Sequence, residues 1–198
     1  MQALRIIQDE HQALAGIIHA VHYMLKEIGA GQMQPDFRLL RAMVHYLDAY
    51  PEQRHHPRED HYLFARLKQL TGDGAEAIAR LEREHAMGDA RMQALNDAVR
   101  AYEADPTGRF DDFVRAFDTF ADFYRSHMML EEREIFPLCR KHFSSEDWRV
   151  IDAAFRENRD PMTGEALPVE QEDFQRIFSR LVAAAPPPIG LGAGLADD

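Results

Sequence analysis

The sequence predicts an all-α fold: an up-down-up-down antiparallel four-helix bundle, followed by two further helices and an extended, proline-rich tail. Three observations support this fold. Four long segments repeat apolar residues every three or four positions, the periodicity of a helix with one buried face. Short stretches rich in glycine, proline and aspartate separate them, and short connections join antiparallel neighbours. The hydrophobic fraction, 45% of 198 residues, is sufficient for one core.

The first expected helix runs from about residue 3 to 28 and ends at Gly29-Ala30-Gly31. Its apolar seam carries a histidine, His11, at a position where the spacing predicts leucine. The seam consists of Leu4, Ile7, His11, Leu14, Ile18, Val21, Leu25 and Ile28.

The second expected helix starts near Pro35 and ends before Thr71. Pro51 and Pro57 fall inside it. A proline within a helix removes a backbone hydrogen bond, so it kinks the helix or opens a bulge. The apolar face before the two prolines therefore cannot be extrapolated past them.

The third expected helix covers about residues 74–103, and the fourth about residues 109–142. Their seams also contain residues that can bind metals: His85 in the third, His127 and Glu131 in the fourth. The third seam is Ile78, Leu81, His85, Gly88, Met92, Leu95, Val99 and Tyr102; the fourth is Phe110, Phe113, Phe117, Phe120, Tyr124, His127, Glu131 and Leu138.

The C-terminal part predicts two more helices. Residues 144–147 are typical of a helix start and lead into Trp148, Ile151 and Phe155, and an amphipathic helix is expected near residues 170–184. We therefore expect the bundle over residues 1–143, a helical extension over 144–185, and an extended or disordered tail over 186–198.

Composition excludes several classes of protein. The net charge of -11 opposes binding to nucleic acid, which requires clustered Lys and Arg. The single cysteine, Cys139, excludes an internal disulfide and multi-cysteine zinc or iron-sulfur sites. No apolar run approaches the length of a membrane helix, and charged residues interrupt the first 14 positions, unlike a secretory signal. We therefore expect a cytoplasmic protein.

Two His-x-x-x-Glu pairs, His55/Glu59 and His127/Glu131, are the strongest local signals. Residues four apart on a helix share a face, close enough to bind one metal ion or to bridge two. One such pair is weak support, because this composition produces roughly one by chance. However, the ten-residue stretches that begin at these histidines, HHPREDHYLF and HMMLEEREIF, align without a gap and lie on alternate helices.

A lone histidine in a helical seam is more often a hydrogen-bonded core residue than a ligand, and a metal-free structural bundle is the corresponding alternative. Here histidines occur on all four helices, with His11 and His85 on the two that lack a His-x-x-x-Glu pair. Buried imidazoles and carboxylates without partners would each cost several kcal/mol, a cost that a shared metal removes. The pattern therefore favours a metal site.

This ordered set of residues resembles the hemerythrin-like, or HHE cation-binding, domain family over about residues 3–142. The resemblance implies a four-helix bundle around an oxo- or hydroxo-bridged di-iron centre. It implies that Glu59 and Glu131 bridge the irons and that His11, His55, His85 and His127 are terminal ligands. Manganese or zinc can replace iron at such donors.

The chain departs from the family pattern on the third and fourth helices. Hemerythrins proper have a second histidine four residues after that of the third helix, where this chain has Asp89. This leaves either an open coordination position or another ligand, such as Asp89 or His22. On the fourth helix the family spacing selects Glu132, whereas the seam favours Glu131.

A further choice on the second helix lies between the pair His55/Glu59 and the pair His56/Asp60. The internal match favours the first pair. The apolar stripe, counted backwards from Leu63, favours the second.

A ferritin-like di-iron bundle is the second metal-binding interpretation. Glu52-x-x-His55 and Glu82-x-x-His85 have the required spacing, but the other helices do not offer the single glutamates of that pattern.

We therefore expect a non-haem di-iron protein that binds or senses O2, NO, peroxide or iron. The alternatives are a di-iron redox enzyme, either peroxide-consuming or ferroxidase/oxidase-like, and the metal-free bundle. The expected partner is a small diatomic ligand or peroxide, and a homodimer formed through the C-terminal helices is a further option.

Overall fold

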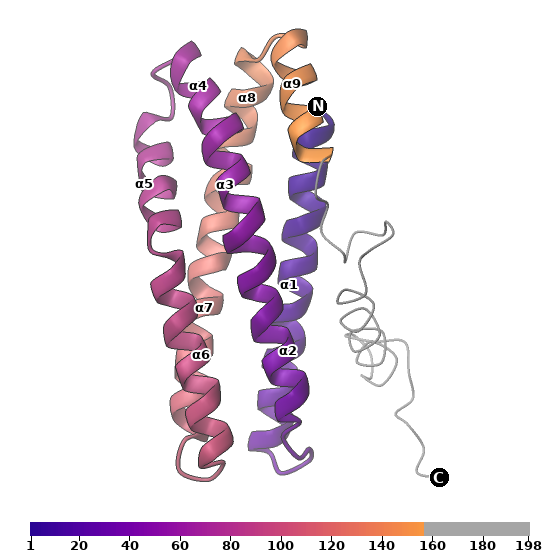
Figure 1. Ribbon diagram of the computed structural model, residues 1–198, viewed down its shortest axis with the longest axis vertical. Helices are drawn as coiled ribbons and strands as arrows, with labels where there is room; N and C mark the ends of the chain where they lie inside the picture. Colours follow the sequence, from indigo (N-terminus) through magenta and orange to yellow (C-terminus); the bar gives the residue numbers. More distant parts are fainter. Residues whose placement is uncertain (157–198) are drawn as a thin grey trace, which may run out of the picture.

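The computed structural model describes residues 1–156, and within that range the chain is helical and contains no strand. Long helical segments lie side by side along the longest dimension of the molecule (Figure 1). The first is α1 (Gln2–Gly29), and the second is built from α2 (Phe37–Leu47), η1 (Asp48–His55), α3 (His56–Arg58), η2 (Glu59–Phe64) and α4 (Ala65–Leu70). The third consists of α5 (Ala75–Ala86) and α6 (Gly88–Ala104), and the fourth of α7 (Phe110–Leu130), η3 (Glu131–Ile135) and α8 (Phe136–His142).

Helix ends lie close to the positions that the sequence predicts. The side chain of Asp36 caps α2 by accepting a 3.0 Å hydrogen bond from the backbone N–H of Leu39. Gly31 and Gly74 have φ angles of 71° and 75°, a left-handed conformation that glycine adopts without strain. Both glycines lie where the chain leaves one helical segment and approaches the next.

The helix expected after residue 144 is α9 (Ser145–Arg156), next to the N-terminus in Figure 1. Ser144 and Asp147 cap its start, because the Asp147 backbone N–H donates to Ser144 Oγ and the Asp147 carboxylate accepts from the Ser144 backbone N–H. Trp148, Ile151 and Phe155 are buried. The second C-terminal helix, near 170–184, and the tail over 186–198 lie outside the described residues.

The prolines of the second segment coincide with an altered helix, which confirms the predicted bulge. Pro51 lies inside η1, a π-helix, and the backbone N–H of His56 bonds to the carbonyl of Pro51, five residues earlier. A π-helix is rare and marks functional positions in many proteins. The turn is therefore wider here than in an α-helix, just before the residues that carry the strongest sequence signal.

The third segment differs from the prediction of one continuous helix, because Met87 separates α5 from α6. Gly88 follows the break and is buried. A Cβ atom on residue 88 would overlap the carboxylate of Glu52. The glycine therefore lets the third segment approach the second.

The apolar core forms two clusters. One is built around the second half of α1 with α2, α6 and α7, and it includes Leu47, Leu95 and Phe117. The other gathers the start of α1 with α4, α5, α8 and α9, and it includes Ile7 and Leu81. The predicted metal ligands lie between these two clusters along the chain.

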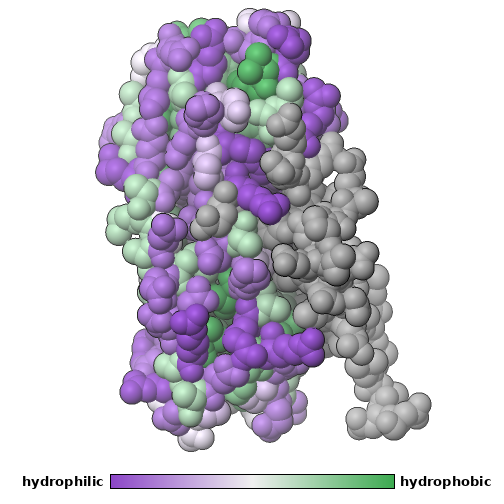
Figure 2. All heavy atoms as spheres, viewed as in Figure 1, coloured by the Kyte–Doolittle hydropathy of each residue, from purple (hydrophilic) through white to green (hydrophobic). Residues whose placement is uncertain are grey.

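The visible face of the molecule is largely hydrophilic, as Figure 2 shows. None of the helices within residues 1–156 is sufficiently long and apolar to cross a bilayer.

Candidate metal centre

Five histidines and two glutamates converge in a layer between the two apolar clusters. All four long segments contribute: His11 comes from α1, His55, His56 and Glu59 from the second segment, His85 from α5, His127 from α7 and Glu131 from η3. Their side chains are at most 8% exposed. Seven buried polar side chains thus meet where a seam of leucines would otherwise continue.

The donor atoms form two groups that share Glu59 and Glu131. His11 and His55 belong to the first group, and His85 and His127 to the second; His56 joins His85 and His127 in a further set without the glutamates. Three sets of donors lie within 4.8 Å of one another: His11, His55, Glu59 and Glu131; Glu59, His85, His127 and Glu131; and His56, His85 and His127. Donor atoms that each lie about 2.0–2.2 Å from the same ion are separated from one another by at most about twice that distance. The donors of each set are therefore close enough together to surround one cation.

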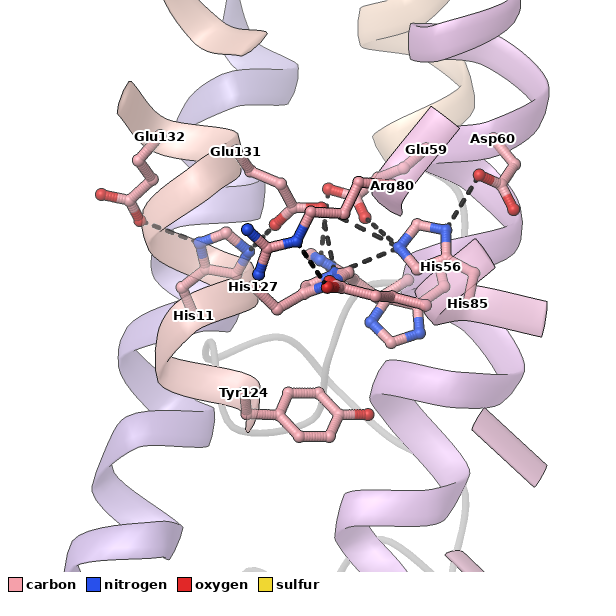
Figure 3. Close-up of polar contacts among 12 residues, drawn as sticks. His11, His56, Glu59, Asp60, Arg80, His85, Tyr124, His127, Glu131 and Glu132 are labelled. Atoms are coloured by element: carbon pink, nitrogen blue, oxygen red, sulfur yellow. Dashed lines mark hydrogen bonds and ion pairs between the residues drawn. The ribbon is translucent and has the colours of Figure 1, made fainter. Parts of the chain in front are cut away.

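Each shared carboxylate presents a different oxygen to each group. Glu59 Oε1 lies 3.3 Å from His55 Nε2, and its Oε2 lies 3.8 Å from His85 Nε2. Glu131 Oε2 lies 3.1 Å from His11 Nε2, and its Oε1 lies 3.3 Å from His127 Nε2. Figure 3 shows both carboxylates between the histidines. Each of the two carboxylates could therefore contact a cation in either group.

An outer carboxylate orients every one of the five imidazoles. In each case Nδ1 is the atom bonded, which leaves Nε2 directed at the centre. The pairs are His11 with Glu132 (2.8 Å), His55 with Glu10 (2.6 Å), His56 with Glu52 (3.0 Å), His85 with Asp60 (2.8 Å) and His127 with Glu84 (2.8 Å). Such a carboxylate selects the tautomer with Nδ1 protonated and makes Nε2 a stronger metal ligand.

The inner atoms lack the partners that buried polar groups require. His11 Nε2 and the four carboxylate oxygens of Glu59 and Glu131 make no hydrogen bond within the described residues. The short distance from His11 Nε2 to Glu131 does not have hydrogen-bond geometry. Each unsatisfied group costs about 1–3 kcal/mol. Cations bound by both groups would contact all of these atoms, so the donor set fits a metal pair.

The pKa values show where protons lie without a metal. Burial would lower the pKa of His127, but Glu131 and Glu84 raise it to about 10. Burial, with the neighbouring Glu131, raises the pKa of Glu59. Burial would also raise the pKa of Glu131. The neighbouring His127 and His11 nevertheless hold the pKa of this carboxyl well below its usual range. Without a metal, His127 is therefore protonated at neutral pH, and metal binding would displace that proton.

His56 behaves differently from His127. Burial and the neighbouring His85 and His127 lower the pKa of His56 well below its ordinary value. Its imidazole is therefore neutral at neutral pH, the form that binds metals.

The structure brings together the six residues that the sequence selects, and it answers the alternatives. On the fourth segment Glu131 faces the centre, whereas Glu132 forms a hydrogen bond with Nδ1 of His11, the ring nitrogen that points away from the centre. On the second segment His55 and Glu59 face the centre, and so does His56, which the sequence offered only as part of the alternative pair. Asp60 instead orients His85.

Neither residue considered as a substitute for the missing histidine reaches the centre. Asp89 is exposed, and His22 pairs with Asp118 at 3.0 Å. His56 supplies the fifth imidazole instead. Two signals could have indicated this arrangement: the adjacent histidines after Pro51, and the acidic residue directly before His11 and before His85.

The lone cysteine is not a candidate ligand. Cys139 is buried, and burial together with the negative charge of Glu59 raises the pKa of its thiol to about 12. The thiolate, which is the form that binds metals, is therefore not populated at neutral pH.

A small cavity adjoins the centre. Its volume is about 20 Å³, and His11, His55, His56 and His127 contribute to its wall. The remaining wall is formed by Glu10, Leu14, Tyr46, Pro51, Arg58, Tyr124 and Met128. A cavity needs roughly 10–15 Å³ of such space to hold one water molecule. This cavity therefore accepts a molecule of a few atoms.

Comparison with known families agrees with this geometry. The family model described as the hemerythrin HHE cation binding domain matches residues 2–139. This range contains all seven converging residues and ends before α9. Comparisons with curated proteins and with solved structures gave no match. The chain belongs to the hemerythrin HHE cation-binding domain family.

Proposed function

We propose that this chain is a non-haem di-iron protein that binds O2, NO or peroxide at the ion held by His11 and His55. The observation that carries the proposal is the pair of donor groups that share Glu59 and Glu131. An antiparallel up-down-up-down arrangement of the four long segments is part of the proposal, because short connections reverse the chain between them.

The two groups are unequal, which supports one site for an external ligand. The group of His85, His127 and the shared glutamates has His56 beside both of its histidines, whereas the group of His11, His55 and the same glutamates has no additional histidine in its set. An ion with octahedral preference therefore has more room for an external ligand in the His11 group. The adjoining cavity is lined by histidines of both groups, and its size limits the ligand to a few atoms.

Two ferrous ions bound here would together supply the two electrons that take dioxygen to the oxidation level of peroxide. The residues of the chain determine the setting for this chemistry. Imidazoles make the ferrous state more accessible than a set of carboxylates alone does. The apolar clusters on both sides, with Leu14 and Tyr46 in the cavity wall, limit water and stray protons near the centre.

A peroxide-consuming activity is the second candidate, favoured by Tyr124. This side chain lines the cavity, and its hydroxyl donates to Glu52, which accepts from His56. Burial and Glu52 raise the pKa of Tyr124 well above 10. The phenol therefore keeps its proton at neutral pH and holds it beside the cavity, where turnover of peroxide requires a proton donor.

The metal-free structural bundle is disfavoured by two interior carboxylates that make no hydrogen bond within the described residues. Glu59 and Glu131 are fully buried and face each other without hydrogen bonds. A purely structural core gains nothing from this arrangement, because apolar residues of similar size would remove the cost.

Metal content and the visible spectrum test the proposal. Protein is purified anaerobically from iron-replete cells, its iron is quantified, and the spectrum is recorded before and after air is admitted. We expect about two irons per chain and new absorption bands on oxidation. His61→Ala is the matched control, because His61 is exposed on the same segment and should change nothing. A fully folded chain without bound metal, or with zinc alone, would overturn the proposal.

A further inference from the structure

The wall of the cavity at the centre consists mostly of buried side chains. Of the eleven residues in its wall, nine are buried or have buried side chains, and only Arg58 and Met128 are partly exposed. These two side chains are therefore the part of the wall that solvent reaches. Arg58 is the more constrained of the two, because several groups fix its guanidinium.

Arg58 is held on three sides. Its Nε donates to the carbonyl of Arg54 at 2.9 Å, and its Nη2 donates to Glu10 Oε1 at 3.0 Å. Its Nη1 approaches the carbonyl of Phe155 at 3.4 Å, and the guanidinium lies 5.1 Å from the centre of the Phe155 ring. The side chain is only 12% exposed. A planar guanidinium suits this combination of donors and ring contact better than a lysine ammonium does.

The contact with Phe155 comes from outside the family domain. The family match ends at residue 139, whereas Phe155 lies in α9. Two further contacts keep α9 in place: Arg66 pairs with Asp147 at 2.7 Å, and Asp152 pairs with the N-terminal amino group at 2.9 Å. A helix added after the family domain thus touches a residue of the cavity wall.

The same arginine is connected to one metal-binding histidine. Glu10 accepts from Arg58 through Oε1 and from His55 Nδ1 through Oε2, so one carboxylate joins the cavity opening to the His11 group. Any movement of Arg58 changes both the opening and the carboxylate that orients His55.

We propose that Arg58 is the gate of the ligand cavity and that α9, through Phe155, holds this gate closed. The inference rests on the proposed function in that it concerns access to the same centre. Met128 is the other partly exposed residue of the cavity wall. The gate sets how fast a small ligand reaches the centre, while the seven ligands set whether a metal is bound.

The alternative role of Arg58 is to neutralise Glu10 only. Arg58→Lys separates the two roles, because a lysine keeps a positive charge beside Glu10 but cannot also bond to the Phe155 carbonyl and stack on its ring. Phe155→Leu removes the ring from α9 and keeps its apolar bulk. Arg66→Lys is the matched control, because it weakens another contact of α9 that lies away from the cavity wall.

The test measures azide association with the cobalt(II)-loaded full chain by stopped-flow absorbance. We expect Arg58→Lys and Phe155→Leu to raise the association rate constant at least about fivefold, and Arg58→Ala at least about tenfold. Arg66→Lys should stay within about twofold of wild type. Trp148 is the only tryptophan and belongs to α9, so its fluorescence shows whether α9 stays docked. The cobalt content of each variant shows whether its metal ligands are intact.

Rates within about twofold of wild type in both Arg58→Lys and Phe155→Leu would overturn the gate, as would an equal increase in Arg66→Lys. Cobalt and azide make this result independent of iron and oxygen. An iron-loaded wild type that does not respond to air or peroxide contradicts the proposed function, whereas unchanged variant rates contradict the gate. A wild type that binds no cobalt overturns both.

Discussion

The second and fourth helical segments carry matching motifs but contribute differently to the centre. HHPREDHYLF on the second segment supplies two histidines and one glutamate, while HMMLEEREIF on the fourth supplies one of each. The difference lies at the second residue of each motif. His56 faces the metal groups, whereas its counterpart Met128 lines the cavity opening.

The backbone explains this difference. On the second segment one π-helix ends at His55, the first residue of the motif, and a second π-helix begins at Glu59. On the fourth segment the residues before His127 form a regular α-helix, and the π-helix begins only at Glu131. Successive residues of an α-helix are turned by about 100°. The wider π turn reduces this angle, so adjacent His55 and His56 can serve two neighbouring ions.

Glu59 and Glu131, the two shared glutamates, should contribute equally to metal binding despite this difference. Their loss should have the largest effect on metal content. Glu59→Ala and Glu131→Ala each remove both oxygens that the two groups share. We expect metal content to fall from about two ions per chain to near zero in either variant. Elemental analysis of folded protein measures this. Full metal content in one variant alone would show that the two carboxylates do not have the same role.

Substitutions at the second residue of each motif, His56 and Met128, should distinguish the two segments most clearly. His56→Ala removes one of three histidines from one group and should reduce metal content from about two ions to about one. Met128→Ala, at the matching position, should leave metal content unchanged. Metal titration followed by absorbance measures both variants. Two ions retained in His56→Ala would contradict its assignment as a ligand.

Removal of the Glu52 carboxylate, which bonds to Nδ1 of His56, should have a smaller effect on metal binding. Glu52→Ala leaves the His56 imidazole without its orienting partner and should weaken metal binding about 10- to 100-fold. Gly88→Ala should act in the same direction, because the added Cβ overlaps the Glu52 carboxylate. Competition with a chelator measures the affinity, and Gly72→Ala, in open space, is the control. An unchanged affinity in Gly88→Ala would show that Glu52 moves aside at no cost.

Protonation should distinguish His127 from His56. The pKa of His127 is about 10 without a metal, so this imidazole must lose a proton when a metal binds at neutral pH, whereas His56 is already neutral. Lower pH therefore opposes metal binding, with an affinity loss of about tenfold per pH unit for each displaced proton. Calorimetry in buffers of different ionisation enthalpy counts the protons. Equal proton release by wild type and His127→Ala would contradict this assignment.

Much of the helical architecture was predictable from local chemistry. The glycines near residues 29 and 74 and the aspartate at 36 marked helix ends that the structure places within one or two residues. Glu131 was preferred to Glu132 because the seam spacing is a local property of an α-helix, and α7 is regular up to that point. The break at Met87 was not predicted, because it accompanies the approach of Glu52 from another segment.

The sequence by itself determined the long amphipathic helices and the six residues that meet between the two apolar clusters, because periodicity and helix-ending residues act over short stretches of chain. Only the tertiary structure decided that His55 and His56 both face inward, that five outer carboxylates orient the imidazoles, and that Arg58 lies against α9. These features depend on a π-helical backbone and on contacts between residues far apart in the chain. No spacing rule for a single helix contains that information.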